Sequence, residues 1–306
     1  SVAYYDEAHN ATASDNFQAV QAMSQIAANN YFFTATPKFN PDRSVTGSGM
    51  DNVSVYGEVI CKVNFNSLVE QGVIVSPKLR LIQSSANAES VIDSDLNVKT
   101  IKEIVNKSEQ GQLTPKILVC APGTKSIADI VDSSFLRWAN DRGYNVLSID
   151  SKNQGFINGE RGISKAKFLD RLNQLGADPS AKLIVLHYSM LGEGIDVKSF
   201  NSIAFLRKSL GDIFATQSIG RVIRSAPGKT HGNVIVVQHA NDTDNVRSLV
   251  CDIVRSLIES GVPPESFLSE DDGRADEEEI VEDLPDDIIK SVRDVAVEYQ
   301  WSDMLA

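Results

Sequence analysis

The sequence has few of the features that place a protein in a membrane or outside the cell. Its three cysteines, Cys61, Cys120 and Cys251, are far apart and match no metal-ligand spacing, so no disulfide scaffold or zinc site is indicated. No uninterrupted apolar run approaches the roughly 20 residues that cross a bilayer. No basic-then-apolar leader stands at the start. We therefore expect a reduced, cytoplasmic setting and no membrane partner.

Basic residues are also scarce, with 29 Lys and Arg against 41 Asp and Glu and a net charge of −12. The segment from Glu265 to Asp287 holds twelve acidic residues and one basic residue, Arg274, and thus accounts for −11 of this charge. The rest of the chain is close to neutral. A local basic groove for nucleic acid is therefore not excluded.

The 306 residues suffice for two ordinary domains, and the hydrophobic share of 42% and charged share of 23% are those of a globular protein. Near the start, residues 2–5 read as a strand, residues 13–30 have helical spacing, and residues 31–37 read as another strand. This order predicts a parallel sheet. Residues 53–65 are expected to form a pair of short strands around Gly57.

A second block of alternating strands and helices begins near Val75. Its strands are continuously apolar rather than alternating, which is typical of a sheet covered by helices on both faces. The acidic stretch is expected to be a solvated linker. Beyond it, apolar residues from Leu284 to Tyr299 recur on one face of a possible helix that would dock on the second block.

Two groups of residues point to phosphate chemistry. Asp6 and Glu7 follow a buried strand, where one carboxylate can hold Mg²⁺ and the next can orient or deprotonate an attacking water. Far along the chain, "QSIGRVIR" sets Gln217, Arg221 and Arg224 at helical spacing, so that both guanidinium groups can emerge from one face. Two such groups can stabilise charge on a transferring phosphoryl group. A solvated surface helix is the alternative for the arginines.

Two weaker signals lie between these groups. "LGEGIDV" follows a buried strand, and its glycines let the backbone approach a phosphate. "TAT" at Thr34–Thr36 places two hydroxyls after a strand. Neither is specific alone, but the order and separation of DEAH, TAT, GEGID and QxxGRxxR are specific together.

In these motifs the chain resembles the superfamily 2 helicases and translocases, the DExH-box group, from Val2 to about Val237. "DEAH" corresponds to motif II, "TAT" to motif III, "GEGID" to motif V and "QSIGRVIR" to motif VI, while "ILVCAPGTKSIADI" lies where motif IV begins the second domain. The likeness is nearer to repair, phage and restriction-type DNA translocases than to DEAD-box RNA helicases.

The resemblance implies an α/β fold of RecA-like parallel sheets with helices on both faces. Residues 1–74 would be the remainder of a first RecA-like domain, and residues 75–262 a complete second one. An acidic linker at 263–283 and a C-terminal helix at 284–306 would follow. The implied cofactors are ATP and Mg²⁺.

The resemblance also implies roles in hydrolysis. Asp6 would bind Mg²⁺ through water, and Glu7 would be the catalytic base. Arg221 and Arg224 would contact the γ-phosphate.

Other residues would link hydrolysis to movement. His9 and Gln217 would connect the nucleotide state to domain closure, and Thr34 and Thr36 would couple hydrolysis to motion. The motif V residues that meet nucleotide and strand would be Gly194 and Asp196.

The chain departs from the family in one respect: it has no Walker A loop, G-x-x-x-x-G-K-[ST]. The "GKT" at Gly228–Thr230 does not belong to a Walker A loop, because the motif's first Gly would fall on Ile223. The segment also follows the arginine helix and precedes a strand, whereas a Walker A loop follows a strand and precedes a helix. We interpret it as an ordinary turn. We expect motifs I, Ia and Ib to precede Ser1, and this chain alone to bind ATP poorly and to lack turnover.

Nucleic acid, DNA rather than RNA, is the expected partner, together with the missing N-terminal part of the motor core. Contacts to phosphates are expected at loops after strands. The candidates are Gly123, Thr124 and Lys125, which open a helix, and also Ser189 and the pair Arg207–Lys208. Three alternatives remain: a helix cap at Gly123–Lys125, a non-catalytic nucleic-acid-binding module, and the motor part of a restriction enzyme. His187, His239 and Trp138 are expected to be packed or capping residues.

Overall fold

The computed structural model describes residues 1–35, 37–40, 47–84, 93–111, 113–150, 154–188, 197–206, 211–239, 243–267, 281–282 and 284–305. The chain divides into two compact units, Ser1–Asn64 and Phe65–Ala306. The finer division at 74/75, 262/263 and 283/284 stays a prediction.

The small unit is built on two parallel strands, β1 (Val2–Tyr5) and β2 (Asn29–Phe32). They are joined through the 3₁₀ helix η1 (Ala8–Thr12) and α1 (Ser14–Ser24), and α2 (Val53–Tyr56) follows. Side chains from both strands, from α1 and from α2 form a small core on one face of this sheet. The parallel pairing agrees with the predicted strand–helix–strand order.

The other face of the small sheet carries a row of exposed aromatic rings. Tyr4 is 71% exposed and Phe33 is 53% exposed. The ring of Tyr4 lies 5.6 Å from that of Tyr31 and 6.3 Å from that of Phe33. Within the described residues, this sheet is therefore covered on one face alone.

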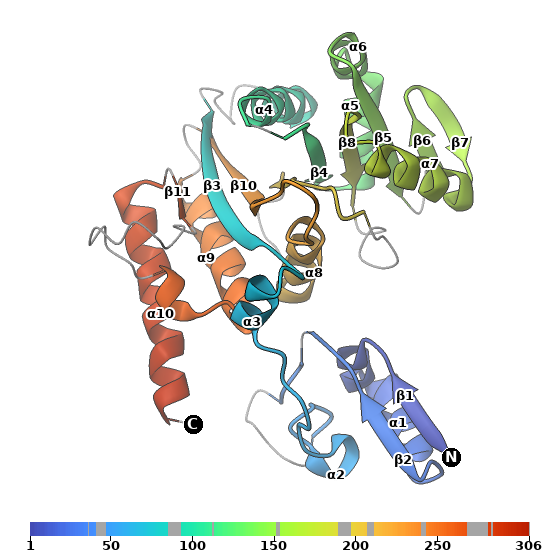
Figure 1. Ribbon diagram of the computed structural model, residues 1–306, viewed down its shortest axis with the longest axis vertical. Coiled ribbons are helices and arrows are strands. Elements are labelled where there is room, and N and C mark those ends of the chain that lie inside the picture. The colour runs from blue at the N-terminus through green and yellow to red at the C-terminus, as the bar shows by residue number, and fades with distance from the viewer. Residues whose placement is uncertain are drawn as a thin grey trace. The chain divides into compact units, whose positions relative to one another are not determined.

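The large unit contains one mostly parallel sheet, shown in Figure 1. The described strands are β3 (Ser76–Ser84), β4 (Lys116–Cys120), β5 (Tyr144–Asp150), β6 (Gln154–Ile157), β7 (Glu160–Ile163), β8 (Lys182–His187), β9 (Ser202–Phe205), β10 (His231–His239) and β11 (Val281–Glu282). They lie in the order β11-β3-β10-β9-β4-β8-β5-β6-β7. Only the pairs that β6 makes, with β5 and with β7, are antiparallel among these strands.

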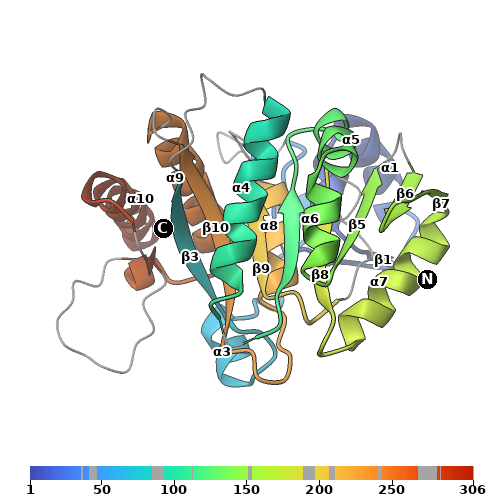
Figure 2. The ribbon, with the colours of Figure 1, turned by 90° about the horizontal axis from the view of Figure 1, so that it is seen from above.

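Helices cover both faces of this sheet, as Figure 2 shows from above. One core packs the strands against α4 (Asp93–Ser108), α5 (Thr124–Asp132) and α6 (Phe135–Asp141). The other packs them against the remaining helices of the unit. Those helices are α3 (Phe65–Glu70), α7 (Lys165–Ala177), α8 (Asp212–Val222), α9 (Thr243–Glu259) and α10 (Asp286–Leu305).

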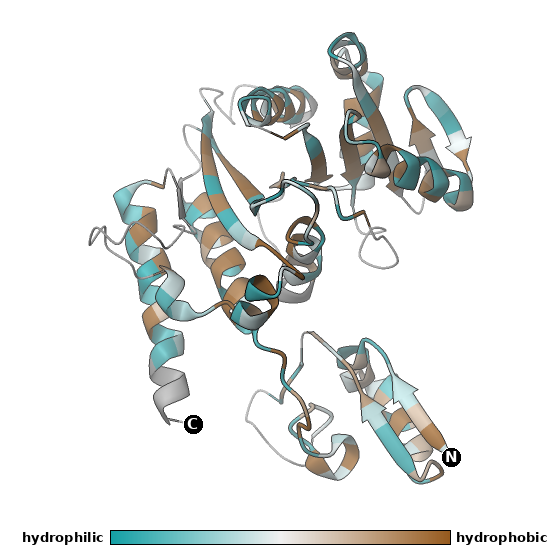
Figure 3. Cartoon of the chain, in the orientation of Figure 1, coloured by the Kyte–Doolittle hydropathy of each residue, from teal (hydrophilic) through white to brown (hydrophobic). Residues whose placement is uncertain are grey.

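The middle strands owe their continuous apolar sequence to this two-sided burial. In β4, Leu118 and Cys120 face one core while Ile117 and Val119 face the other, and all four are fully buried. Figure 3 shows these strands mostly in the colour of hydrophobic residues. The predicted fold class, a parallel α/β sheet with helices on both faces, is confirmed.

One local prediction was wrong. Residues 53–65 do not form a strand pair: α2 ends at Tyr56, Gly57 turns with φ 74°, and residues 58–64 are irregular and exposed. At the break between α5 and α6 the Ser133 hydroxyl donates to the Ile130 carbonyl and accepts from the Phe135 amide.

The C-terminal part returns to the large unit. After the 3₁₀ helix η2 (Pro264–Phe267), β11 pairs with β3 at the edge of the sheet. Helix α10 then packs its apolar stripe, including Ile288 and Val292, into the same core as α9, and the two helices lie side by side (Figure 1). The acidic residues 268–280 lie outside the described residues.

In the part of the chain that the structure describes, no helix combines the length and the apolar character needed to cross a membrane.

Candidate functional site

The motif II residues stand in a tight turn at the carboxyl end of β1. Glu7 has φ 48° and ψ 46°, a left-handed conformation that a non-glycine residue adopts at a cost. The backbone N–H of Glu7 donates to the Asp6 carboxylate at 2.9 Å, and the Ala8 N–H donates to the Phe33 carbonyl at 2.9 Å. These bonds hold the turn, so that the Asp6 side chain is exposed and that of Glu7 is 42% exposed.

His9 brings motif II and motif III together. Its side chain is buried, and its Nδ1 lies 3.0 Å from the Thr34 hydroxyl and 3.3 Å from the Glu7 carboxylate. A proton on Nδ1 can be donated to the Glu7 carboxylate or to the Thr34 hydroxyl, so the same nitrogen lies within reach of both motifs. Thr36, the other motif III threonine, lies outside the described residues.

The motif VI residues lie on and just beyond α8. This helix packs on α9, where the Thr216 hydroxyl donates to the Ser256 carbonyl at 3.3 Å. Gln217 is half-buried, and Arg221, in the last turn, is buried with 6% exposure. The alternative of a surface helix with two solvated arginines therefore does not fit Arg221.

Arg224 stands outside the helix, contrary to the predicted helical spacing. Helix α8 ends at Val222, and Arg224 forms an antiparallel bridge with Ile74. The Val75 N–H donates to the Ile223 carbonyl at 2.7 Å, and the Ser225 N–H donates to the Val73 carbonyl at 3.4 Å. A strand-like pairing thus fixes the backbone of Arg224, which is half-buried.

The "GKT" segment is a turn between α8 and β10, as its sequence context indicates, and its lysine binds the protein's own backbone. Lys229 is 7% exposed, and its Nζ donates to the carbonyls of Phe200, Arg224 and Lys198 at 2.5, 2.8 and 3.4 Å. Burial, together with the neighbouring Arg224 charge, lowers the pKa of Lys229 to about 7. No local sequence pattern predicts these contacts, because the accepting residues are 5 to 31 positions away from Lys229.

Gly123–Lys125, the described part of the predicted nucleic-acid contacts, lies at the carboxyl edge of the large sheet. Because β4 and β8 are parallel, Cys120 and His187 end them side by side, with Sγ 3.0 Å from Nε2. Gly123 precedes the first residue of α5, Thr124, and Lys125 is exposed at the start of this helix. Ser189, Gly194, Asp196, Arg207 and Lys208 lie outside the described residues.

The aromatic and histidine residues expected to be structural are packed. His187 is 1% exposed. The ring of Trp138 lies 5.9 Å from that of Phe135 and is flanked by Lys102 and Arg142, whose charged groups lie 5.4 and 4.9 Å from its centre.

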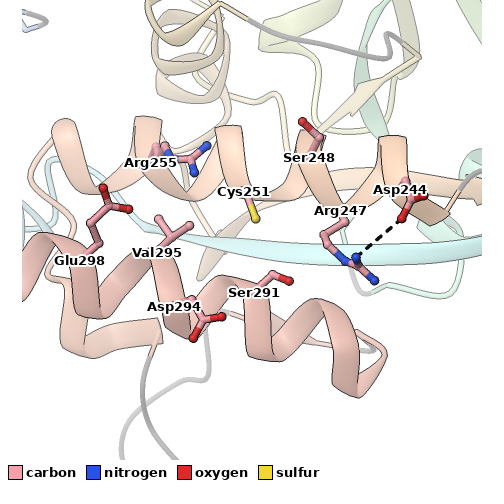
Figure 4. Close-up of a pocket in the computed structure, with 9 residues that line it drawn as sticks. All are labelled: Asp244, Arg247, Ser248, Cys251, Arg255, Ser291, Asp294, Val295 and Glu298. Carbon is pink, nitrogen blue, oxygen red and sulfur yellow. Dashed lines mark ion pairs between the residues drawn. The ribbon is translucent and has the colours of Figure 1, made fainter.

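A groove of about 390 Å³ lies between α9 and α10, as Figure 4 shows, and contains none of the predicted site residues. Both arginines that line it are in ion pairs. Arg247 pairs with Asp244 at 3.6 Å and with Asp287 at 2.7 Å, and Arg255 pairs with Asp252 at 3.3 Å. The groove is therefore part of the helix–helix contact.

Comparison with known proteins finds similarity in fold and none in sequence: no protein-family model and no curated protein matches. One similar structure is an ATP-dependent type ISP restriction-modification enzyme, LlaBIII, bound to DNA. Its TM-score is 0.66 and its identity 18%, over 97% of this chain and 23% of that chain. Another is a fragment described as an HsdR subunit of a type I restriction enzyme from Vibrio vulnificus YJ016. Its TM-score is 0.54 and its identity 18%, over 80% of this chain and 44% of that chain.

At 18% identity, these similarities to parts of two restriction-enzyme structures are similarities of fold. The chain covers about a quarter of the length of the first of these proteins and less than half of the second.

Proposed function

We propose that this chain is part of an ATP-dependent DNA helicase or translocase of superfamily 2, in which ATP hydrolysis is coupled to movement along nucleic acid. The cofactors are ATP and Mg²⁺. The intact motor hydrolyses ATP, and this chain alone does not.

The observation that carries the proposal is the contact of Glu7, His9 and Thr34. A half-exposed carboxylate stands in a strained turn at the end of a strand, and a buried histidine links it to a hydroxyl at the end of the neighbouring strand. Strained backbone clusters at functional sites, where surrounding bonds hold it in place. A module with no catalytic role has no need of a carboxylate held in this way.

The motif VI side chains support the same activity. Arg221 is buried, and the backbone of Arg224 is held by the pairing with residues 73–75. Positive charge fixed in this way can stabilise the charge that develops on a transferred phosphoryl group, with little reorganisation at the moment of reaction.

The residues present fit a magnesium nucleotide in part. The exposed Asp6 carboxylate offers the oxygen ligand that Mg²⁺ prefers. When bound, the ion neutralises charge on the phosphates. The half-exposed Glu7 would accept the proton of the attacking water, and His9 would hold Glu7 in place. No Walker A sequence exists in these 306 residues, so the phosphate cradle has to come from elsewhere.

The exposed face of the small sheet supports this requirement. Tyr4, Tyr31 and Phe33 present stacked rings to solvent on and directly after β1 and β2, and an exposed apolar patch of this kind is typical of a surface that other residues cover. We infer that further residues of the same motor domain cover these rings in the intact protein.

DNA is the nucleic acid that we propose as the partner. The two structures described above are of restriction enzymes, and one of them is bound to DNA. This favours the motor part of a restriction enzyme among the alternatives. Gly123, Thr124 and Lys125 at the carboxyl edge of the large sheet would bind phosphates, together with Ser189. Gly194 and Asp196 would lie where motif V meets the nucleotide and the strand.

Phosphate release from ATP with Mg²⁺ tests the proposal in a longer protein that contains this chain and a Walker A loop. We expect turnover that DNA stimulates, and a Glu7→Gln variant whose kcat falls by about a hundredfold or more. Glu58→Gln, which removes an exposed carboxylate of the same unit, is the matched control and should retain activity.

The result that would favour a non-catalytic binding module is DNA binding without turnover in the longer protein. Turnover equal in the wild type and Glu7→Gln would remove Glu7 from the mechanism. Separate arms with single-stranded and double-stranded DNA distinguish a strand-separating motor from a duplex translocase.

A further inference from the structure

The buried lysine Lys229 makes hydrogen bonds both to the segment that follows motif V and to the end of motif VI. The Lys229 ammonium has three N–H donors, and three backbone carbonyls accept from it. A buried cation is tolerated only when its hydrogen bonds are satisfied in this way.

The three carbonyls belong to two segments far apart in sequence. Lys198 and Phe200 stand just after motif V and before β9, whereas Arg224 is the second arginine of motif VI. Lys229 therefore fastens the end of the arginine segment to the chain that follows motif V.

A second restraint acts on the same backbone. Residues 223–225 pair with residues 73–75, through the bridge between Ile74 and Arg224 and the hydrogen bonds beside it. The backbone of Arg224 is thus held from two directions.

We propose that Lys229 is a positioning residue for ATP hydrolysis, which fixes the backbone of Arg224 relative to residues 198–200 so that the guanidinium reaches the transferred phosphate. This inference rests on the proposed function. It adds a residue that no motif names and that acts through Arg224, without contact with the nucleotide.

Lys116 provides a matched control within the same unit. It is 3% exposed, and its Nζ donates to the carbonyls of Leu175, Gly176 and Asp178 at 3.2, 2.8 and 2.6 Å, at the end of α7. The chemistry is that of Lys229, but no candidate catalytic residue lies among the acceptors.

The first measurement is backbone hydrogen exchange on this chain, in Lys229→Met and Lys116→Met. We expect Lys229→Met to speed exchange at the amides of Val75 and Ser225, and Lys116→Met to leave these two amides unchanged. If Lys229→Met does not fold, Lys229→Gln, which keeps two N–H donors, takes its place. Unchanged exchange at both amides would overturn the restraint.

The second measurement is ATP hydrolysis by the longer protein, expressed per folded molecule. We expect Lys229→Met to lower kcat by about tenfold to a hundredfold with a small change in KM, since a misplacement of about 1 Å has effects of this size. Lys116→Met should keep the kcat of the wild type. Equal kcat in the two variants would overturn the positioning role.

The two proposals fail in different ways. Loss of turnover in Glu7→Gln together with full turnover in Lys229→Met would reject the positioning role and leave the proposed function intact. Absence of turnover in the wild-type longer protein would reject the proposed function, and the positioning role with it, whatever the exchange result.

Discussion

The buried ammonium of Lys229 makes the stability of the large unit depend on pH in a direction that can be worked out. Burial and the Arg224 charge lower its pKa from 10.5 to about 7 in the folded protein. An unfolded chain keeps the value near 10.5. Between these two pH values the unfolded state binds more protons than the folded state, so stability rises with pH.

The size of the effect follows from the shift. Each pKa unit corresponds to about 1.4 kcal/mol. Between pH 6.5 and 9.5 the folded side chain loses its proton while the unfolded one keeps it, which adds roughly 3 kcal/mol to the free energy of unfolding. Below about pH 7 both states are protonated, and this contribution is absent.

Urea unfolding at pH 6.5, 8 and 9.5 measures this pH dependence, as the difference in the free energy of unfolding between the wild type and Lys229→Met. Groups shared by the two proteins cancel in this difference. We expect the difference to move in favour of the wild type by roughly 3 kcal/mol as the pH rises. Lys165→Met, which removes an exposed lysine, should show no such trend. A flat difference for Lys229→Met would refute the reasoning, because the three carbonyls would then hold the pKa near its ordinary value.

Three substitutions test the packing around the arginine segment and the core. Gly220→Ala should stabilise the protein by about 0.5–1 kcal/mol, since this glycine lies inside α8 with open space for a methyl group. Gly232→Ala should destabilise it by about 1–3 kcal/mol, because the methyl would overlap the backbone carbonyl of Val222. Phe168→Ala should cost about 3–5 kcal/mol, since the ring is fully buried. Urea unfolding measures all three, and equal effects of the two glycine substitutions would contradict the described packing of β10 against the end of α8.

The sequence predicts the central sheet well because two-sided burial leaves a direct signal. Residues 116–120 and 183–186 are apolar at every position or nearly so, and the structure places them in the middle of the sheet. The β6–β7 hairpin gives a weaker signal. Its strands have four residues each and end at the sheet edge, where β7 has one buried position, so no apolar run marks it.

Local sequence patterns predict the wrong secondary structure where a segment does not pack against one neighbouring element along its whole length. Residues 53–65 are apolar enough for strands, but only Val55, Tyr56 and Phe65 among them have buried apolar side chains. Without a neighbouring strand to pair with, the backbone between Gly57 and Asn64 takes no regular form. Propensity for a strand is a property of packing against neighbours, which this stretch lacks in the described structure.

Some residues of the candidate site can be found from local sequence motifs, and others depend on contacts between residues far apart in the sequence. The identities of Asp6, Glu7 and Arg221 follow from short motifs, and a reader of the sequence finds them. The function of Lys229 depends on carbonyls at 198, 200 and 224, which come together only when α8, β9 and β10 are in place. The same three letters, GKT, that elsewhere mark a lysine bound to phosphates here mark a lysine bound to backbone oxygens. In both settings several oxygen atoms lie around the lysine nitrogen, and the fold decides whether they come from a nucleotide or from the chain.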